Sequence, residues 1–318
     1  MGISIVKPGL LTTLQDLGRH GYQKSGMVVS GAMDTLALRI GNLLLGNPVH
    51  EAGLECTLTG PLIVFEEDQL IAITGGNLSP QVDGKPVEMW RPLYLHKGSK
   101  LSFGKALAGC RAYLCVYGGF DVPEVLSSKS TYLRAGIGGW EGRALKANDL
   151  IPFKRTYQGS LRKFGWLAGR NIYPDLSIRN IQVVKGPEFE QFCEQSIHEF
   201  LNRPFGISKE ADRMGYRLSG PTLQRKKDNE LLSAAVTFGT VQVPGQGLPI
   251  VLMADHQTTG GYPRIAQVIT TDLTLLAQAQ PGQEITFELI TLAKAQALLL
   301  AREQQINQLQ QTITLKYG

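Results

Sequence analysis

The chain has 318 residues, of which 43% are hydrophobic and 19% charged, a composition typical of a globular protein with one large domain or two ordinary ones. The net charge of +5 is spread along the sequence, and the longest basic cluster, at residues 225–227, argues against nucleic-acid binding. No apolar stretch reaches about 18 residues, and the N-terminus lacks a basic region followed by a long apolar run. We therefore expect a cytoplasmic protein with neither a transmembrane helix nor a signal peptide, whose four cysteines are reduced.

The first half reads as short strands separated by turns, with one helix. The helix is predicted over residues 33–46, where Leu36, Ile40 and Leu43 fall at helical spacing. A tight hairpin is predicted over residues 82–87, because its centre is an Asp-Gly pair. Strands are predicted at residues 3–7, 62–67, 70–74, 93–97, 100–104 and 111–117.

The second half repeats this pattern after a weakly patterned connector. Strands are predicted at residues 181–186, 234–244, 249–255, 264–270 and 284–291, and helices at 188–202 and 271–280. A final helix at 293–313 carries a narrow apolar stripe that we expect to pack on the body of the protein, and pairing with a partner chain is the alternative. The fold class is therefore mainly β, with two barrel-like units, a few short helices and a C-terminal helix. The predicted divisions are a first domain at 1–155, a connector at 156–178, a second domain at 179–292 and a helical tail at 293–318.

Familiar catalytic signatures are missing from the sequence. It contains no phosphate-binding P-loop, no Gly-x-Gly-x-x-Gly motif after a strand and no Gly-x-Ser-x-Gly elbow. The five histidines lack metal-ligand spacing, so no metal site is expected. Chemistry on a nucleotide or carboxyl group would then need an unusual site or another subunit.

Polar side chains gather first at residues 12–26 and 30–34. Gln15, Asp16 and Arg19 surround a glycine, which allows a sharp turn that brings them together. They are candidates for a binding site, and a local Asp16–Arg19 ion pair that fixes a loop is the alternative. Asp34 stands at the start of the first predicted helix, where capping is the alternative to ligand binding.

A second polar segment covers residues 211–220. Asp212 and Arg213 precede a glycine, and Arg217 follows four residues later. Two arginines near one turn can clamp a carboxylate or a phosphate. Ordinary surface arginines are the alternative.

The third segment, Asp-His-Gln-Thr-Thr-Gly-Gly-Tyr-Pro at residues 255–263, follows an apolar strand. Asp255 can accept a proton or hold an amide N–H, and Gln257 offers both a donor and an acceptor. Gly260 and Gly261 would let backbone N–H groups approach a ligand oxygen, and Tyr262 could stack or donate. A tight turn capped by Asp255 is the alternative.

Seven motifs in a fixed order connect these segments. They are TTLQDLGRHGY (12–22), SGAMD (30–34), LECTLTGP (54–61), GGFDVPEVL (118–126), DRMGYRLSG (212–220), GTVQVPGQGLPIVLMADHQTTGGYP (239–263) and QPGQEITF (280–287). Together they resemble the biotin-dependent carboxyltransferase family, also called the allophanate hydrolase subunit 2 family. This family includes the carboxyltransferase domain of urea carboxylase, the regulator KipA and the C subunit of 5-oxoprolinase.

The resemblance implies two cyclophilin-like β-barrel domains with the site in a cleft between them. From their chemistry we expect catalytic roles for Asp255, Gln257 and Asp16, and binding of a cofactor by Gly260 and Gly261. The residues implied to bind substrate are Arg19, Gln15, Asp34, Asp212, Arg213, Gln242, His256 and Tyr262. Family members often carry Arg where this chain has His256, so positive charge there is expected to depend on pH near neutrality.

The resemblance further implies the C subunit of an ATP-dependent 5-oxoprolinase, which opens 5-oxo-L-proline to L-glutamate. The implied partners are a KipI-like protein (the B subunit of 5-oxoprolinase) and a LamB/YcsF-like protein (the A subunit of 5-oxoprolinase). ATP, with Mg²⁺, is expected at or shared with a partner subunit. Biotin is not expected on this chain, because the sequence lacks a Met-Lys-Met biotinylation site.

Two alternatives come from the same resemblance. One is a KipA-type protein that binds and antagonises a KipI-like kinase inhibitor. The other is a carboxyltransferase component that acts on a urea-like amide with a separate biotin carrier.

Overall fold

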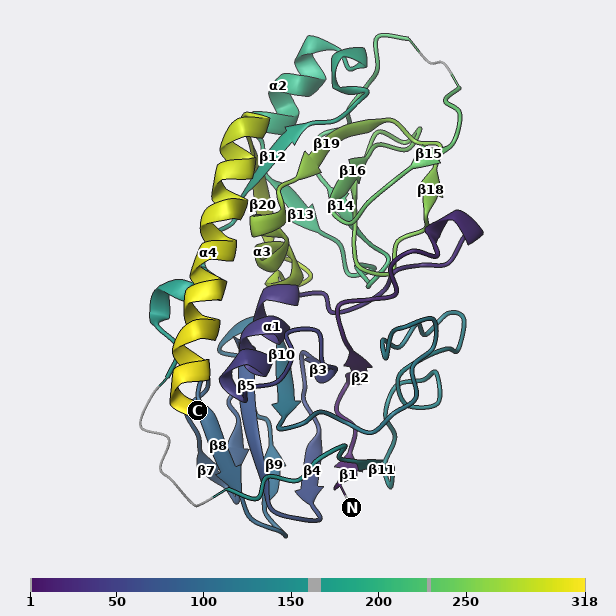
Figure 1. The fold of residues 1–318 in the computed structure, drawn as a ribbon. Coiled ribbons are helices and arrows are strands. Elements are labelled where there is room, and N and C mark those ends of the chain that lie inside the picture. The colour runs from purple at the N-terminus through teal and green to yellow at the C-terminus, as the bar shows by residue number, and fades with distance from the viewer. Residues whose placement is uncertain (1, 160–166, 228–229, 318) are drawn as a thin grey trace. The chain divides into compact units, whose positions relative to one another are not determined.

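A computed structural model describes residues 2–159, 167–227 and 230–317 of the chain, which divides into two compact units (Figure 1). The first unit comprises Met1–Arg19, Ser30–Pro174 and Gln304–Gly318, and the second comprises His20–Val29 and Asp175–Glu303. Most of the predicted connector belongs to the first unit, where Ala168 and Ile172 are buried in the core. A weak sequence pattern hid this, because isolated side chains rather than a periodic stripe make the contacts.

Two sheets of antiparallel strands form the first unit. The six-stranded sheet has the order β11-β1-β4-β9-β6-β7, and the five-stranded sheet has the order β2-β3-β10-β5-β8. The first contains β1 (Gly2–Lys7), β4 (Leu62–Phe65), β6 (Gln81–Val82), β7 (Lys85–Pro86), β9 (Lys100–Ser102) and β11 (Leu150–Pro152). The second contains β2 (Leu11–Gln15), β3 (Gly53–Thr57), β5 (Gln69–Asn77), β8 (Pro92–Leu95) and β10 (Ala108–Val116).

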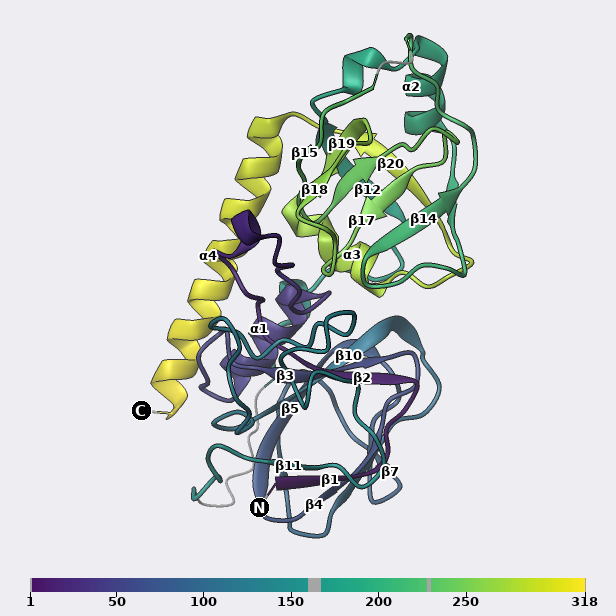
Figure 2. The ribbon, with the colours of Figure 1, turned by 90° about the vertical axis from the view of Figure 1, so that its right-hand side faces the viewer.

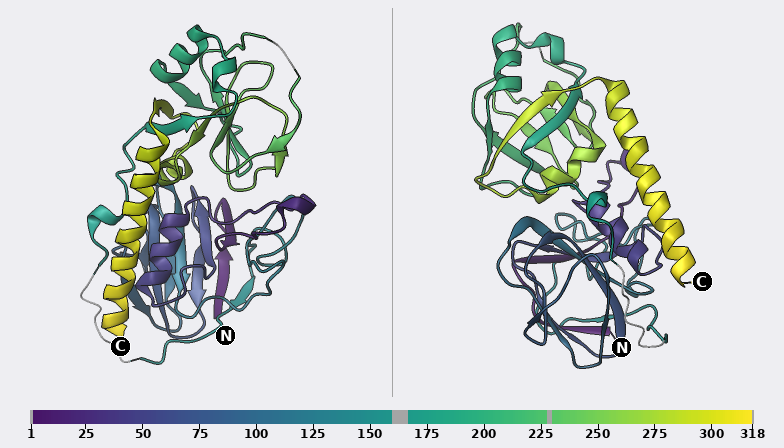
Figure 3. Two further views of the ribbon diagram at one scale, coloured as in Figure 1. Left: turned by 45° about the horizontal axis from the view of Figure 1, so that its top comes forward. Right: turned by 90° about the vertical axis from the view of Figure 1, so that its left-hand side faces the viewer.

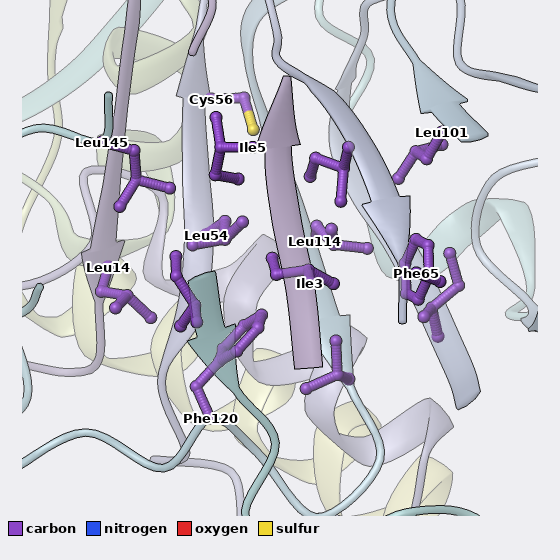
Figure 4. Packing of buried hydrophobic residues seen from close by; sticks show 14 of the residues in the cluster. Ile3, Ile5, Leu14, Leu54, Cys56, Phe65, Leu101, Leu114, Phe120 and Leu145 are labelled. Atoms are coloured by element: carbon purple, nitrogen blue, oxygen red, sulfur yellow. The ribbon is translucent and has the colours of Figure 1, made fainter. Parts of the chain in front are cut away.

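The core of this unit lies between the two sheets. Strand β1 directs Ile3 and Ile5 inward, and Leu14, Leu54 and Leu114 meet them from the other sheet (Figure 4). Alternate residues of a strand point to opposite faces, so each sheet offers one apolar face to this core.

The five-stranded sheet is also covered on its outer face, by α1 (Thr35–Leu44). The helix packs on β5 and β10 (Figure 3), where Leu70 and Tyr113 join the buried side chains Leu36 and Ile40. Cover on both faces explains why β5 and β10 are almost continuously buried. The predicted helix at 33–46 is therefore confirmed.

The predicted hairpin at 82–87 is also confirmed. Strands β6 and β7 pair through Gln81 opposite Pro86 and Val82 opposite Lys85. Asp83 and Gly84 between them have φ values of 50° and 76°, as a two-residue turn with left-handed central residues requires.

A closed barrel of seven strands forms the second unit, with the order β12-β19-β16-β17-β14-β13-β20 (Figure 2). Only β12 and β20 pair in parallel among its described strands. The strands are β12 (Asn180–Lys185), β13 (Phe205–Ile207), β14 (Gly215–Ser219), β16 (Thr240–Gln242), β17 (Ile250–Leu252), β19 (Arg264–Val268) and β20 (Glu284–Leu289). The predicted mainly-β class is confirmed.

A predicted strand at 234–244 is wrong over its centre. The structure has β15 (Ala234–Ala235), then a turn, then β16, and β15 pairs outside the barrel with β18 (Thr259–Gly260). Gly239 adopts a φ of 85°, and Thr240 donates its backbone N–H to the carbonyl of Thr237. The turn thus breaks a run that β-propensity alone would continue.

The predicted helix at 188–202 is also interrupted. The structure has a 3₁₀ turn, η3 (Phe189–Gln191), followed by the separate helix α2 (Glu194–Asn202). The two do not join into one helix because the backbone of Cys193, between them, is extended. The predicted helix at 271–280 likewise begins with a 3₁₀ turn, η4 (Thr270–Asp272), before α3 (Leu273–Gln278). The remaining 3₁₀ turns are η1 (Gln23–Ser25) and η2 (Arg170–Ile172).

The C-terminal helix α4 spans Leu292–Tyr317. Its Ile306 and Ile313 are buried in the core cluster of the first unit, and Leu309 packs against that cluster. Packing on the body of the protein, predicted from the apolar stripe, is confirmed for these residues. None of the described helices combines the length and apolar character that a membrane crossing needs.

Ile306→Ala tests this packing. Truncation of a buried isoleucine leaves a cavity, so we expect the free energy of unfolding to fall by about 2–5 kcal/mol. Gln305→Ala, at the preceding, exposed position of the same helix, should change it by less than about 0.5 kcal/mol. Chemical denaturation measures both variants, and equal effects would contradict the packing of α4.

Candidate functional site

In the first unit, the predicted site residues centre on the carboxylate of Asp16, at the end of β2. Its Oδ1 accepts hydrogen bonds from Gly18 N (2.8 Å), Ser128 Oγ (2.8 Å) and Ser130 Oγ, and its Oδ2 accepts one from Lys129 N (2.6 Å). The group is buried, so these bonds fix both the carboxylate and the loop at residues 128–131.

Gln15 and Arg19 bind the same loop. The Nη2 of Arg19 donates to the carbonyl of Ser130, and the Nε2 of Gln15 donates to the carbonyl of Thr131 at 3.1 Å. Gly138 packs directly against this contact. A larger residue would not fit, because a Cβ at that position would lie 2.0 Å from the carbonyl oxygen of Ser130. The structure therefore brings Gln15, Asp16 and Arg19 together around one buried loop.

The loop at 128–131 is the part of this arrangement that sequence reasoning missed. Its Lys129 forms a buried ion pair with Glu51, with 2.7 Å between Nζ and Oε1, and also donates to the carbonyl of Phe120 at 3.2 Å. The available signal was the polar run Ser-Ser-Lys-Ser-Thr at 127–131. A run of this kind also describes an ordinary surface turn.

Asp34 caps α1, as the structural alternative predicted. Its Oδ1 accepts from Ala37 N at 3.1 Å, and its Oδ2 accepts from the hydroxyl of Tyr173. Its own N–H donates to the Tyr113 hydroxyl, which donates to Glu55. Capping is confirmed, and substrate binding by Asp34 stays a prediction.

In the second unit, the predicted residues centre on a buried ion pair between Arg213 and Asp255. Arg213 Nε lies 2.9 Å from Asp255 Oδ2, and Arg213 Nη2 lies 2.9 Å from Asp255 Oδ1. The backbone N–H of Asp255 also donates to the carbonyl of Arg213 at 2.7 Å. Each side chain is only 6% exposed, so the two segments are held by a desolvated, bidentate contact.

The two arginines of this segment have different environments. The alternative that both are ordinary surface arginines is wrong for Arg213, which is buried. It holds for Arg217, whose side chain is 63% exposed. Asp212, which is exposed, accepts hydrogen bonds from Met214 N (2.8 Å) and Gly215 N (3.1 Å) and so shapes the turn that carries Arg213.

His256 follows Asp255 in the sequence and is buried. Its Nδ1 lies 2.6 Å from the carbonyl of Gln257, which can only accept, so Nδ1 carries the proton. Burial lowers the pKa of His256 below its usual 6.5. The expectation of a charge that titrates near neutrality is therefore corrected, since this imidazole is neutral at pH 7.

The remaining predicted residues lie on the segment that leads into β18 and out of it. Gln257 is half-buried, and Tyr262 is 51% exposed. Gly260 lies against Gln242, the last residue of β16, since a Cβ at position 260 would be 2.5 Å from Gln242 Nε2. A Cβ at Gly261 would have ordinary contacts with Leu231 and Ser233.

Chemically, the second unit offers a fixed carboxylate and guanidinium together with amide groups, which suits a ligand with an amide and a carboxylate. Within the described residues, no group of three or more His, Cys, Asp and Glu side chains is placed to hold a metal ion. Binding of a cofactor by Gly260 and Gly261 stays a prediction.

Comparison with known proteins decides the family. A model of the carboxyltransferase domain, subdomain A and B, matches residues 25–289. The chain belongs to this carboxyltransferase domain family. It is 42% identical over 303 residues to the 5-oxoprolinase C subunit of Escherichia coli (strain K12), covering 95% of each chain. It is 40% identical over 305 residues to the 5-oxoprolinase C subunit of Haemophilus influenzae, covering 96% of each.

The carboxyltransferase domain family also includes longer proteins with the same fold. The crystal structure of K. lactis urea amidolyase superposes with a TM-score of 0.90 at 30% identity. The match covers 97% of this chain and 20% of that chain, so this chain spans about a fifth of the length of the urea amidolyase.

His256→Asn tests the burial of the neutral imidazole. Because the folded pKa is lowered, the unfolded state takes up the proton first, so the wild type loses stability as the pH falls from 6.5 through the folded pKa. The variant should lack this loss, while His198→Asn, at an exposed position, should keep it. Thermal unfolding between pH 8 and pH 5 measures it, and parallel curves for wild type and His256→Asn would refute the assignment.

Proposed function

We propose that this chain is the C subunit of a multi-subunit, ATP-dependent 5-oxoprolinase that opens 5-oxo-L-proline to L-glutamate. The observation that carries the proposal is the 40–42% identity to two bacterial proteins of that name, over 95–96% of each chain. The similarity extends over nearly the full length of both compared chains. It therefore supports a shared activity better than similarity within a single domain would.

The substrate is a five-membered lactam with a carboxylate, and its amide is a poor electrophile. Phosphorylation of the lactam oxygen by ATP would activate the ring carbon toward water. The site must then hold an amide N–H, the lactam oxygen and a carboxylate. We assign the amide to Asp255 and Gln257 and the carboxylate to Arg213, all in the second unit. Ligand binding by Arg19 and Asp16 of the first unit stays a separate prediction.

The buried pair supports the assignment to the second unit. A bidentate contact between Arg213 and Asp255 fixes both groups without solvent, so a ligand would meet a pre-oriented carboxylate. Pre-orientation matters here because a misplacement of about 1 Å can cost about 100-fold in rate.

We propose that ATP, with Mg²⁺, binds at or is shared with a partner subunit. The N-termini of α1 and α2 fit phosphate poorly. The N-terminus of α1 is already capped by the carboxylate of Asp34, which would repel a phosphate, and α2 begins with Glu194. The proposed partners are a KipI-like protein (the B subunit) and a LamB/YcsF-like protein (the A subunit).

A second candidate is a carboxyltransferase that acts on a urea-like amide with a separate biotin carrier. The TM-score of 0.90 to K. lactis urea amidolyase favours it. The same amide-binding groups would serve both reactions. The lower identity, 30% against 42%, makes it the weaker of the two.

Reconstitution tests the proposal. We expect glutamate to form from 5-oxo-L-proline and Mg-ATP only when this chain and both partners are present. Asp255→Ala should lower the rate by about 100-fold or more, because it removes the oriented carboxylate. Arg203→Ala, at an exposed arginine of the same unit, should leave the rate unchanged.

Three outcomes separate the candidates. Equal glutamate formation without this chain would refute the 5-oxoprolinase proposal. Carboxylation of urea with an added biotin carrier, without glutamate formation, would favour the carboxyltransferase. Tight binding of the KipI-like protein with neither reaction would favour a KipA-type regulator.

A further inference from the structure

Among the described residues of the second unit, one buried side-chain amide has no hydrogen-bond partner for its nitrogen. Gln242, at the end of β16, is 1% exposed, and its Nε2 has no partner among the described residues. Buried amide nitrogens are nearly always bonded, because leaving one unbonded costs free energy. An exception of this kind calls for a physical reason.

The neighbouring polar groups show that the barrel can satisfy such residues here. Thr240 Oγ1, two residues earlier on β16, donates to Gln267 Oε1 at 2.8 Å, and Gln267 Nε2 donates to the carbonyl of Phe238 at 2.8 Å. Both residues therefore have partners, whereas Gln242 Nε2 has none among the described residues.

The strand neighbour of Gln242 is bonded as well. Arg264, opposite Gln242 on β19, donates from Nε and Nη2 to the carboxylate of Glu188 at 2.8 and 2.7 Å. Its Nη1 donates to the carbonyl of Ala235 at 3.1 Å. The unpaired amide is thus specific to Gln242 and is not a property of this part of the sheet.

Gly260 makes room for this amide. A Cβ at position 260 would lie 2.5 Å from Gln242 Nε2, which no ordinary contact permits. Gly260 does not have the left-handed φ that requires glycine, so space rather than backbone conformation explains the residue. Any side chain there would push the amide out of its place.

We propose that Gln242 determines specificity by donating a hydrogen bond from Nε2 to the lactam oxygen of the substrate. This inference rests on the proposed 5-oxoprolinase function and adds the donor that the lactam oxygen needs. A site built to donate to an oxygen rejects an analogue that lacks it, because the donor is then left unpaired.

The substrate reaches this donor by displacing the ribbon of β15 and β18. The amide nitrogen of Gln242 is buried in this conformation, so a neighbouring segment must move before a ligand can contact it. Gly260 of β18 lies against this nitrogen. The ribbon pairs Ala234 with Gly260 and Ala235 with Thr259, and the backbone N–H of Val236 donates to the carbonyl of Thr258. Such short pairing opens at smaller cost than a barrel strand.

Gln242→Met tests the inference, because methionine keeps the length of the side chain and removes the amide. Removal of an unpaired buried donor should raise the melting temperature of the second unit by roughly 2–4 °C. In the same variant, kcat/KM for 5-oxo-L-proline in the reconstituted complex should fall by about tenfold or more. A gain in stability with a loss of activity is the signature of a group kept for its ligand.

Gln267→Met is the matched control. Gln267 has partners at both ends of its amide, so its loss should lower the melting temperature. If Gln242→Met also lowers the melting temperature, or leaves kcat/KM unchanged, the inference is wrong while the 5-oxoprolinase proposal stands.

Calorimetry on this chain alone separates the two proposals. The wild type should bind 5-oxo-L-proline about tenfold more tightly than L-proline, which lacks the lactam oxygen, and Gln242→Met should lose this preference. Selective binding without turnover in the complex would overturn the 5-oxoprolinase proposal and keep the role of Gln242. If this chain shows no binding preference and the complex shows no turnover, both proposals are wrong.

Discussion

The bidentate contact between Arg213 and Asp255 is the constraint on which the second unit's candidate site depends. Two charges out of water are tolerated only when each is bonded in good geometry, so the segments that carry them cannot vary independently. The backbone of Asp255 is bonded to the carbonyl of Arg213, and His256 N–H donates to the carbonyl of Met253. The start of the segment that runs to Gly260 is therefore fixed, which places that glycine against Gln242.

The first unit also contains a buried carboxylate that follows a strand, and the groups that donate hydrogen bonds to it are neutral. Asp16 also follows a strand, but its carboxylate is bonded to hydroxyl and backbone N–H groups of the loop at 128–131. Arg19 then donates to the carbonyl of Ser130 in that loop. In each unit a carboxylate that follows a strand thus fixes a neighbouring segment.

Sequence reasoning succeeded where the information is local. The helix at 33–46 and its cap at Asp34 follow from spacing and from unpaired N–H groups within one turn. It failed where contacts join distant segments, since nothing near Asp16 indicates that it binds a loop more than a hundred residues away. The burial of His256 and the unpaired amide of Gln242 are tertiary properties, so no pattern of neighbouring residues could predict them.

A double-mutant cycle on Arg213 and Asp255 tests the central claim most directly. Arg213→Met and Asp255→Leu should each lower the free energy of unfolding by about 3–5 kcal/mol, because each leaves an uncompensated buried charge. The double variant should recover most of this stability, since an apolar pair of similar volume replaces the ion pair, yet it should not recover glutamate formation. Additive losses of stability, or a double variant with wild-type turnover, would contradict the account.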